Sequence, residues 1–234
     1  VPPGRKGMQP ALALSYSSSA RNGWLGVGWG LEVGYIERST KDGVPQYTAT
    51  DPLALGLGGV AHELIWTASG MYRAKDEGLF LRIVFKGVSG WEVTDKSGTR
   101  YLFGQTPGAR IDAGGRDFRW ALDEVIDPNG NSLTLTYAKD QGQLYPDRIE
   151  YAAHRASGRT ATQRVTFLLE GRPDAERSLR HGTDMPVVTA KRLWAVEMRT
   201  LVGGAWALAR HYRLTYRTSA RTGRSLLAGI RQIG

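Results

Sequence analysis

The residues best suited to chemistry are scattered along this chain. Its 234 residues include four histidines and no cysteine, so disulfides and thiolate metal sites are excluded. The histidines are far apart and no H-E-x-x-H spacing occurs; they are His62, His154, His181 and His211. We therefore expect no metal ion and no cofactor, and interpret the histidines as structural or solvated side chains.

Motifs for nucleophiles and phosphates are also missing. The nearest match to the G-x-S-x-G elbow is "GVSGW" at Gly87, which lacks the last glycine. A G-x-G-x-x-G phosphate loop beginning at Gly26 and Gly28 would need glycine at position 31, where Leu31 stands. These absences predict that the chain has no catalytic residue and is not an enzyme.

Carboxylates are numerous, and Asp123, Glu124 and Asp127 are close together in sequence. They lie beside a turn signal, where an aspartate accepts hydrogen bonds from backbone amides, and we interpret them in this way. An alternative is a glycan-active hydrolase. That activity needs two carboxylates facing each other across a cleft, roughly 5 to 9.5 Å apart.

The segment "GWLGVGWGLEV", residues 23–33, alternates between apolar residues and glycine. Its odd positions from Leu25 to Val33 are all apolar and include Trp29, whereas Gly26, Gly28 and Gly30 occupy even positions. This spacing predicts a strand with one buried face and one flat face, against which another backbone or a large ring packs closely.

Period-two alternation continues through the chain and indicates half-buried antiparallel strands. Residues 132–137, "SLTLTY", and 211–217, "HYRLTYR", alternate apolar and polar side chains. Turn signals separate such runs: Asn22-Gly23 is a hairpin signal, and Asp127-Pro128-Asn129-Gly130 fits a type I turn. The sequence predicts an all-β fold of many short strands, with one helical stretch near "RPDAERSLRHG", residues 172–182.

Two Trp-led stretches have the same order of features. Trp91 precedes an Asp-x-x-Gly turn at Asp95 and a return strand with Tyr101, and Trp120 precedes the turn at Asp127 and a return strand with Tyr137. Repeated hairpins of this kind cannot bury a face alone, so we expect them to stack side by side into an extended sheet.

Composition indicates an ordinary globular chain, with 41% hydrophobic and 23% charged residues. No run approaches the roughly 18 to 20 apolar residues of a membrane-spanning helix. We expect one all-β domain over residues 1–234, with a subdivision near 147 as an alternative. The chain begins at Val1, from which we expect a piece of a longer protein.

Positive charge is concentrated in the last third. Residues 1–147 hold 15 Lys+Arg and 16 Asp+Glu (15 − 16 = −1), whereas residues 148–234 hold 16 and 6 (16 − 6 = +10). The arginines are spread over strand faces and no nucleic-acid recognition motif accompanies them, so we expect no nucleic-acid partner. We interpret them as a solvated strand face, and an acidic partner is an open alternative.

Seven tryptophans raise the alternative of a surface module that binds glycans or mediates adhesion. Such a module would stack sugars on exposed indole rings. Each tryptophan alternates with apolar neighbours, so we expect core positions for them; they are Trp24, Trp29, Trp66, Trp91, Trp120, Trp194 and Trp206.

The stretch from Trp120 to Tyr137, W-x-L-x-x-V-x-D-P-N-G-N-x-L-x-L-x-Y, resembles the unit of Rhs/YD-repeat proteins. The opening "VPPGRKGMQPALALSYSSSARNGWLGVGWGLE" is similar to SpvB-like N-terminal regions and to the B components of Tc insecticidal toxin complexes, as is "YRLTYRTSARTGRSLLAGIRQIG" at the end. The resemblance marks Gly26, Gly28, Trp29 and Gly30 in the opening and Trp120, Asp127, Pro128, Asn129, Gly130 and Tyr137 in the unit as structural motif residues.

The resemblance implies a structural part of a secreted bacterial toxin. In these proteins, strand-turn-strand repeats form a β-shell that encloses or docks a toxic effector. Expected partners are therefore other toxin-complex subunits, the rest of the shell and the enclosed effector. An unfinished sheet edge would also allow self-association, or would need a neighbouring segment.

Overall fold

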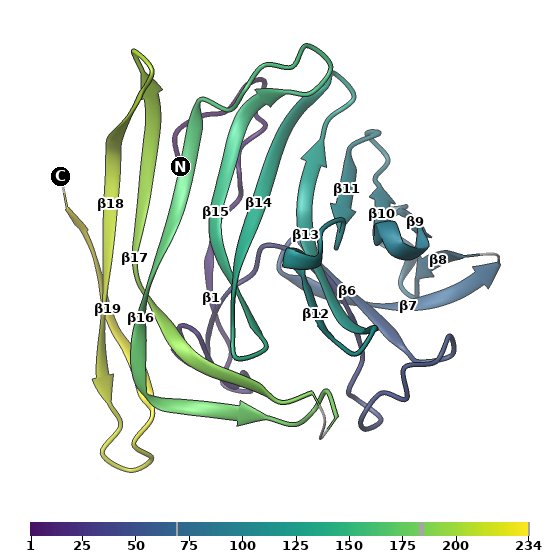
Figure 1. Ribbon diagram of the computed structural model, residues 1–234, viewed down its shortest axis with the longest axis horizontal. Helices are drawn as coiled ribbons and strands as arrows, with labels where there is room; N and C mark the ends of the chain where they lie inside the picture. The colour runs from purple at the N-terminus through teal and green to yellow at the C-terminus, as the bar shows by residue number, and fades with distance from the viewer. Residues whose placement is uncertain (69, 183–184, 234) are drawn as a thin grey trace.

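The computed structural model describes residues 1–68, 70–182 and 185–233, and nearly all of its regular structure is β-strand (Figure 1). The helices of these described residues are three short 3-10 turns, η1 (Glu77–Leu79), η2 (Gly87–Ser89) and η3 (Pro107–Ala109). None of them is long or apolar enough to cross a membrane. The expected all-β fold with stacked antiparallel strands is confirmed.

One large antiparallel sheet has a closed part and an open part. In the closed part, β13 (Arg116–Ile126) pairs on its two sides with β5 (Tyr35–Arg38) and β11 (Arg100–Phe103). The ring between them is completed, in order from β5, by β6 (Leu53–Leu57), β7 (Val60–Ala68), β8 (Met71–Ala74), β9 (Arg82–Phe85) and β10 (Trp91–Thr94). A further strand, β12 (Arg110–Ala113), forms a hairpin with β13.

The open part continues from β13 in sequence order. It consists of β14 (Asn131–Asp140), β15 (Gln143–His154), β16 (Gln163–Ser178), β17 (Val187–Val202), β18 (Ala205–Thr218) and β19 (Ser225–Ile233). Figure 1 shows these long strands beside the ring, with β19 at the outer edge. The repeated hairpins thus lie side by side, because each strand pairs with the next one along the chain.

Short strands near the N-terminus lie outside the large sheet. There, β1 (Leu14–Tyr16) pairs with β4 (Trp29–Leu31), and β2 (Asn22–Gly23) pairs with β3 (Gly26–Val27). Figure 1 shows the N-terminal segment, residues 1–13, passing behind β14 and β15. This position places the start of the chain against the open part of the sheet.

The core follows the alternation of the strands. In β14, Leu133 and Leu135 are buried whereas Thr134 and Thr136 are exposed. Aliphatic and aromatic side chains fill the ring together. Trp91 and Trp120 lie edge to face with centroids 5.7 Å apart, and the exposed Phe85 contacts both. Edge-to-face packing of this kind is favourable beyond the area that it buries.

The helical stretch predicted over residues 172–182 is wrong. Arg172 to Ser178 belong to β16, which pairs with β17 through a register shift between Gly171 and Glu176. Cross-strand pairing and the hydrogen bonds of Arg172 and Asp174 outweigh the weak local preference for a helix.

The glycine-rich segment is not one regular strand. Gly26 and Gly28 have positive φ values of 85° and 80°, so the backbone turns between β3 and β4 and the odd residues do not share a single face. The Asn22-Gly23 pair is also not a turn, because it forms β2 and the hairpin turns at residues 24–25.

Candidate functional site

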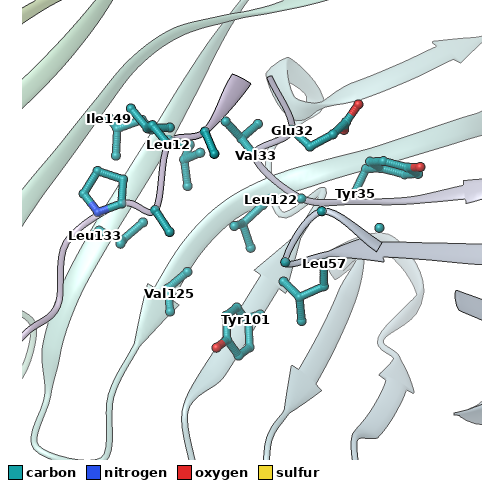
Figure 2. A pocket seen from close by; sticks show the side chains of 18 of the residues that line it. Leu12, Glu32, Val33, Tyr35, Leu57, Tyr101, Leu122, Val125, Leu133 and Ile149 are labelled. Atoms are coloured by element: carbon teal, nitrogen blue, oxygen red, sulfur yellow. The ribbon is translucent and has the colours of Figure 1, made fainter. Parts of the chain in front are cut away.

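A cavity of about 1100 Å³ lies between the N-terminal segment and the sheet. Its sheet side comes from β13, β14 and β15, and its other side from the N-terminal segment, the residues after β4 and the β6–β7 turn. Figure 2 shows apolar side chains around this hollow, with Glu32 at its edge; they include Leu12, Val33, Leu57, Tyr101, Leu122, Val125, Leu133 and Ile149. The volume is slightly above the usual range of ligand sites, roughly 300 to 1,000 Å³.

The N-terminal wall of the cavity offers unpaired backbone groups. Ala11 and Leu12 belong to no strand, and their amides and carbonyls form no hydrogen bond with any described residue. Ala11 is exposed and Leu12 half-buried. Backbone groups normally pair or face water, so this wall presents donors and acceptors that a second extended backbone could satisfy.

The N-terminal segment is anchored before the cavity wall begins. Tyr151 of β15 donates its hydroxyl to the carbonyl of Pro2 at 2.8 Å. Farther along, the amide of Gly4 donates to the side chain of Gln9 at 3.0 Å. The Tyr151 bond attaches the segment to the sheet, and the Gly4 bond fixes the shape of the segment itself.

A buried polar cluster ties the first hairpin to the last strand; we call Asn22, Arg172, Asp174 and Ser225 the Asp174 cluster. Asp174 accepts hydrogen bonds from Arg172 Nε at 3.0 Å and from the Ser225 amide at 2.6 Å. Asn22 Nδ2 donates to Asp174 at 3.1 Å, and Arg172 donates in turn to the Gly23 carbonyl. The guanidinium of Arg172 is fully buried, and such a charge is tolerated only with this degree of hydrogen bonding.

The Asp174 carboxylate is strongly stabilised in its charged form. Burial alone would raise the pKa of Asp174, but hydrogen bonds from Arg172 and Ser225 outweigh burial and hold the pKa far below its ordinary value. The cluster is therefore ionised in any ordinary buffer, and its role is structural.

The turn after β13 is built on Asp127. Its carboxylate accepts hydrogen bonds from the backbone amides of Asn129 and Asn131, at 2.8 Å each. It also accepts one from the side-chain amide of Asn131. The amide of Gly130 donates to the Asp127 carbonyl at 3.0 Å, and Gly130 has a φ of 83°. Burial alone would raise the pKa of Asp127, but the hydrogen bonds from Asn131 and Asn129 lower it overall. The carboxylate caps backbone amides, as its place in a turn predicts.

The turn after β10 has the same construction. The Asp95 carboxylate accepts hydrogen bonds from the backbone amides of Ser97 and Thr99, and the Gly98 amide donates to the Asp95 carbonyl. Because β11 pairs with β13, the two turns are adjacent, and a Cβ on Gly98 would lie 3.2 Å from Pro128 Cγ. The internal similarity in sequence is thus a similarity in hydrogen bonding.

The expected motif residues do not converge on one site. Trp120 is buried in the ring, and the half-buried Tyr137 of β14 donates its hydroxyl to the Leu122 carbonyl at 2.7 Å. The Asp127 turn reaches the cavity only through Asp127 itself. At the other end, Trp29 packs on Tyr16 with centroids 5.4 Å apart, and Gly30 pairs with Ser15.

Two glycines of the opening segment are places of close approach. A Cβ on Gly26 would lie 2.6 Å from the Ser225 carbonyl oxygen, and one on Gly28 would lie 2.5 Å from the Tyr16 ring. By contrast, a Cβ on Gly30 would meet nothing nearer than 3.6 Å.

The other chemical groups are held in structural contacts. Asp123 accepts hydrogen bonds from the Gln105 amide and from Thr106, and burial raises the pKa of Asp123 despite these bonds. Glu124 pairs with Arg155. Over the described ranges, no three His, Asp or Glu side chains gather as a metal site.

Sequence reasoning missed both the cavity and the Asp174 cluster. Arg172 and Asp174 stand in the stretch misread as a helix, and Asn22 was assigned to a turn. Asn22 is about 150 residues away from Arg172 and Asp174, and Ser225 is 51 residues away from Asp174, so no local pattern could reveal the cluster. The alternation in β14 marked one wall of the cavity, but nothing in the sequence placed the N-terminal segment over it.

The fold is that of toxin and effector proteins. The N-terminal domain of effector protein SpvB from Salmonella typhimurium strain LT2 superposes with a TM-score of 0.83 at 21% identity, covering 98% of this chain and 95% of that one. A crystal structure of TcdB2-TccC3 gives a TM-score of 0.81 at 20% identity over 97% of this chain and 15% of that one. The Photorhabdus luminescens Tc holotoxin pore gives 0.78 at 19% identity, covering 95% of this chain and 14% of that one.

The sequence comparison identifies the family. The model of the family "Salmonella virulence plasmid 65kDa B protein", SpvB, matches residues 1–64 and 60–170, so the chain belongs to the SpvB family. The resemblance to SpvB-like regions and Tc components is confirmed. Among curated relatives, the protein of Salmonella choleraesuis strain SC-B67 is 30% identical over 166 residues, which cover 58% of this chain and 28% of that protein. The Salmonella typhimurium protein is 29% identical over the same shares.

These relatives correct the expectation that the chain is not an enzyme. Each is named a mono(ADP-ribosyl)transferase, SpvB. The chain spans only 28% of the length of these relatives, in their N-terminal part. A search for catalytic motifs within this segment could therefore not decide what the family does, because the residues of an active site need not lie in the part that matches.

Proposed function

We propose that this chain is a structural wall of a toxin assembly and that its cavity docks an extended segment of the effector polypeptide. Family membership and the shared fold connect it to effector and Tc toxin proteins. The observation that carries the docking role is the apolar cavity beside the unpaired backbone of Ala11 and Leu12. An extended polypeptide fits both features, because its apolar side chains can fill the cavity and its backbone can pair with that of Ala11 and Leu12.

Residues 1–234 act as one all-β unit of a secreted protein, and its partners are the neighbouring shell segments and subunits and the effector itself. Support comes from the uninterrupted pairing of strands from β13 to β19, which leaves no break in the sheet near residue 147.

A glycan-binding or adhesion surface is not favoured. Trp91 and Trp120 are buried and four other tryptophans are half-buried. Only Trp66, 60% exposed, presents its ring to solvent among the seven. A single exposed indole offers little stacking area compared with the expected row of rings.

Hydrogen exchange tests the docking role. The assembly that contains this chain is compared with and without its effector polypeptide, and exchange is followed at the amides of Ala11 and Leu12. Because these amides are unpaired in the described chain, docking slows their exchange at least tenfold. The amides of Thr134 and Thr136, whose side chains face away from the cavity, serve as the internal control. Equal exchange at Ala11 and Leu12 in both preparations contradicts the proposal.

A further inference from the structure

The end of the β16–β17 hairpin forms an arm that reaches the ring; we call residues 176–182 and 185–189 the arm. A register shift between Gly171 and Glu176 separates the arm from the rest of the hairpin, and bulges of this kind bend a strand. Figure 1 shows the arm turning away from the rest of β16 and β17, along the lower edge of the picture. The Asp174 cluster lies at the bend and ties the hairpin to β19, so the arm begins where this anchor ends.

His181 joins the arm to the ring. The residue is 2% exposed, and its side chain lies edge to face on Phe118 of β13, with ring centroids 4.2 Å apart. The hydroxyl of Tyr47, in the β5–β6 connection, donates to the His181 carbonyl. Met185 of the arm packs in the same small apolar cluster, together with Phe118 and Ile111. The contact between arm and ring is therefore built around one buried imidazole.

The surroundings of this imidazole fit only its neutral form. Arg180 Nε donates to His181 Nε2 at 3.3 Å, and because a guanidinium can only donate, Nε2 carries no proton. His181 Nδ1 is buried without a hydrogen-bond partner among the described residues. A second proton on the ring would thus find no acceptor, and it would also remove the hydrogen bond from Arg180.

The charges around the ring act mainly in the same direction. Burial is the largest cause of the lowered pKa of His181, followed by the positive charges of Arg180 in the arm and Arg119 in β13. Glu37 of β5 and the carbonyl of Ser178 favour the charged ring, but their effects are smaller. Glu37 is also paired with both arginines. The pKa of His181 is therefore about 4 in the closed arm, compared with 6.5 for a free histidine.

The β5–β6 connection does not compensate a charge on His181. Tyr47 presents a neutral hydroxyl to the His181 carbonyl, and the Tyr47 ring is flanked by the cations of Arg38 and Arg116 at 5.3 and 5.1 Å. The carboxylate of Asp51 is paired with Arg38. A protonated His181 would thus gain no free carboxylate from these groups.

We propose that the arm is an acid-sensitive device: binding of a proton by His181 releases the arm from the ring and uncovers Phe118 and Ile111. The open arm exposes the imidazole to water and so binds the proton that the closed arm excludes. Acid therefore favours opening, whereas the rest of the hairpin stays in place because the carboxylate of Asp174 remains ionised. The device is independent of the docking role proposed above, since no residue of the arm lines the cavity.

Hydrogen exchange on the intact protein tests this release, with rates corrected for the intrinsic pH dependence of amides. The readout is the amide of Val188, which donates to the Gln141 carbonyl in the closed arm. The internal control is the amide of Leu193, which lies beyond the bend in β17 and donates to the Trp24 carbonyl. Measurements at pH 7 and pH 5 stay above the range near pH 4 where ordinary carboxylates titrate.

The protection of Val188 is expected to fall about twentyfold from pH 7 to pH 5, because the pKa of His181 is about 4 when closed and 6.5 when open. The protection of Leu193 does not change. His181→Phe keeps an aromatic ring beside Phe118 and abolishes the acid response. His211→Phe, a matched change at the histidine beside Glu197, leaves the response intact.

Arg180→Gln provides a second test if His181→Phe does not fold. Removing this neighbouring charge weakens the acid response without abolishing it, because His181 remains buried. Three results would overturn the proposal: equal protection of Val188 at both pH values, equal loss of protection at Val188 and Leu193, or an undiminished acid response in the folded variants of His181 and Arg180. The second result would mean that acid unfolds the whole protein rather than releasing the arm.

Discussion

Gly26 and Ser225 lie in direct backbone contact although one is near the start of the chain and the other near its end. The approach is so close that a Cβ on Gly26 would lie 2.6 Å from the Ser225 carbonyl oxygen. The adjoining Asp174 cluster joins the same two elements through side chains. The first hairpin and the last strand are thus joined, and the open part of the sheet is held against the N-terminal region.

Replacing Gly26 by alanine tests this contact. Gly26→Ala is expected to destabilise the fold by more than about 2 kcal/mol, since it adds a steric clash to the cost of a positive φ. Gly7→Ala is the matched control, because Gly7 has a φ of 82° and open space around its Cβ position. Urea unfolding of both variants separates the two costs. Equal destabilisation would show that the close approach contributes nothing.

Removing the central carboxylate tests the Asp174 cluster. Asp174→Ala leaves the fully buried guanidinium of Arg172 without its ionic partner, so we expect a loss of about 3–5 kcal/mol in the free energy of unfolding. Asp112→Ala breaks the exposed pair with Lys139 and is expected to cost less than about 1 kcal/mol. A similar, small loss in both variants would mean that the cluster does not stabilise the fold.

The lowered pKa of the buried His181 side chain makes the stability of the fold depend on pH. Burial, followed by the charges of Arg180 and Arg119, lowers the pKa of His181 to about 4 from 6.5. Arg180 Nε donates to His181 Nε2 at 3.3 Å, which requires the neutral ring. Between pH 6.5 and 4 the unfolded chain therefore binds a proton that the folded chain excludes, and stability falls as the pH falls.

Between pH 6.5 and pH 4 the free energy of unfolding is expected to fall by about 3 kcal/mol, because each pKa unit corresponds to about 1.4 kcal/mol. His181→Phe keeps an aromatic ring beside Phe118 and removes the titration. Chemical unfolding at several pH values, compared between the wild type and the variant, isolates this contribution from that of the carboxylates. Parallel pH profiles for the two proteins would show that His181 is not the cause.

Local features were predictable where short-range chemistry dominates. The alternation in β14 and β18 gave their buried faces correctly, because each strand has one face on the core. The turn at Asp127 was predictable because its carboxylate bonds amides only two and four residues away.

Features that depend on distant partners were not predictable. Closure of the ring needs β13 to pair with both β5 and β11, and no local pattern specifies two partners. Residues 23–33 have a strand-like alternation, but Gly26 and Gly28 have positive φ values and pack closely on Ser225 and Tyr16. The cavity could not be predicted either, because it forms only when the N-terminal segment crosses the sheet.

Site-specific photo-crosslinking tests the docking of effector polypeptide in the cavity most directly. Tyr101, half-buried in the cavity wall, is replaced by p-benzoylphenylalanine in the toxin assembly, and the exposed Trp66 of β7 is replaced in the same way as a control. The account predicts that irradiation links position 101, but not position 66, to the effector. Equal linkage at both positions, or none at position 101, would contradict it.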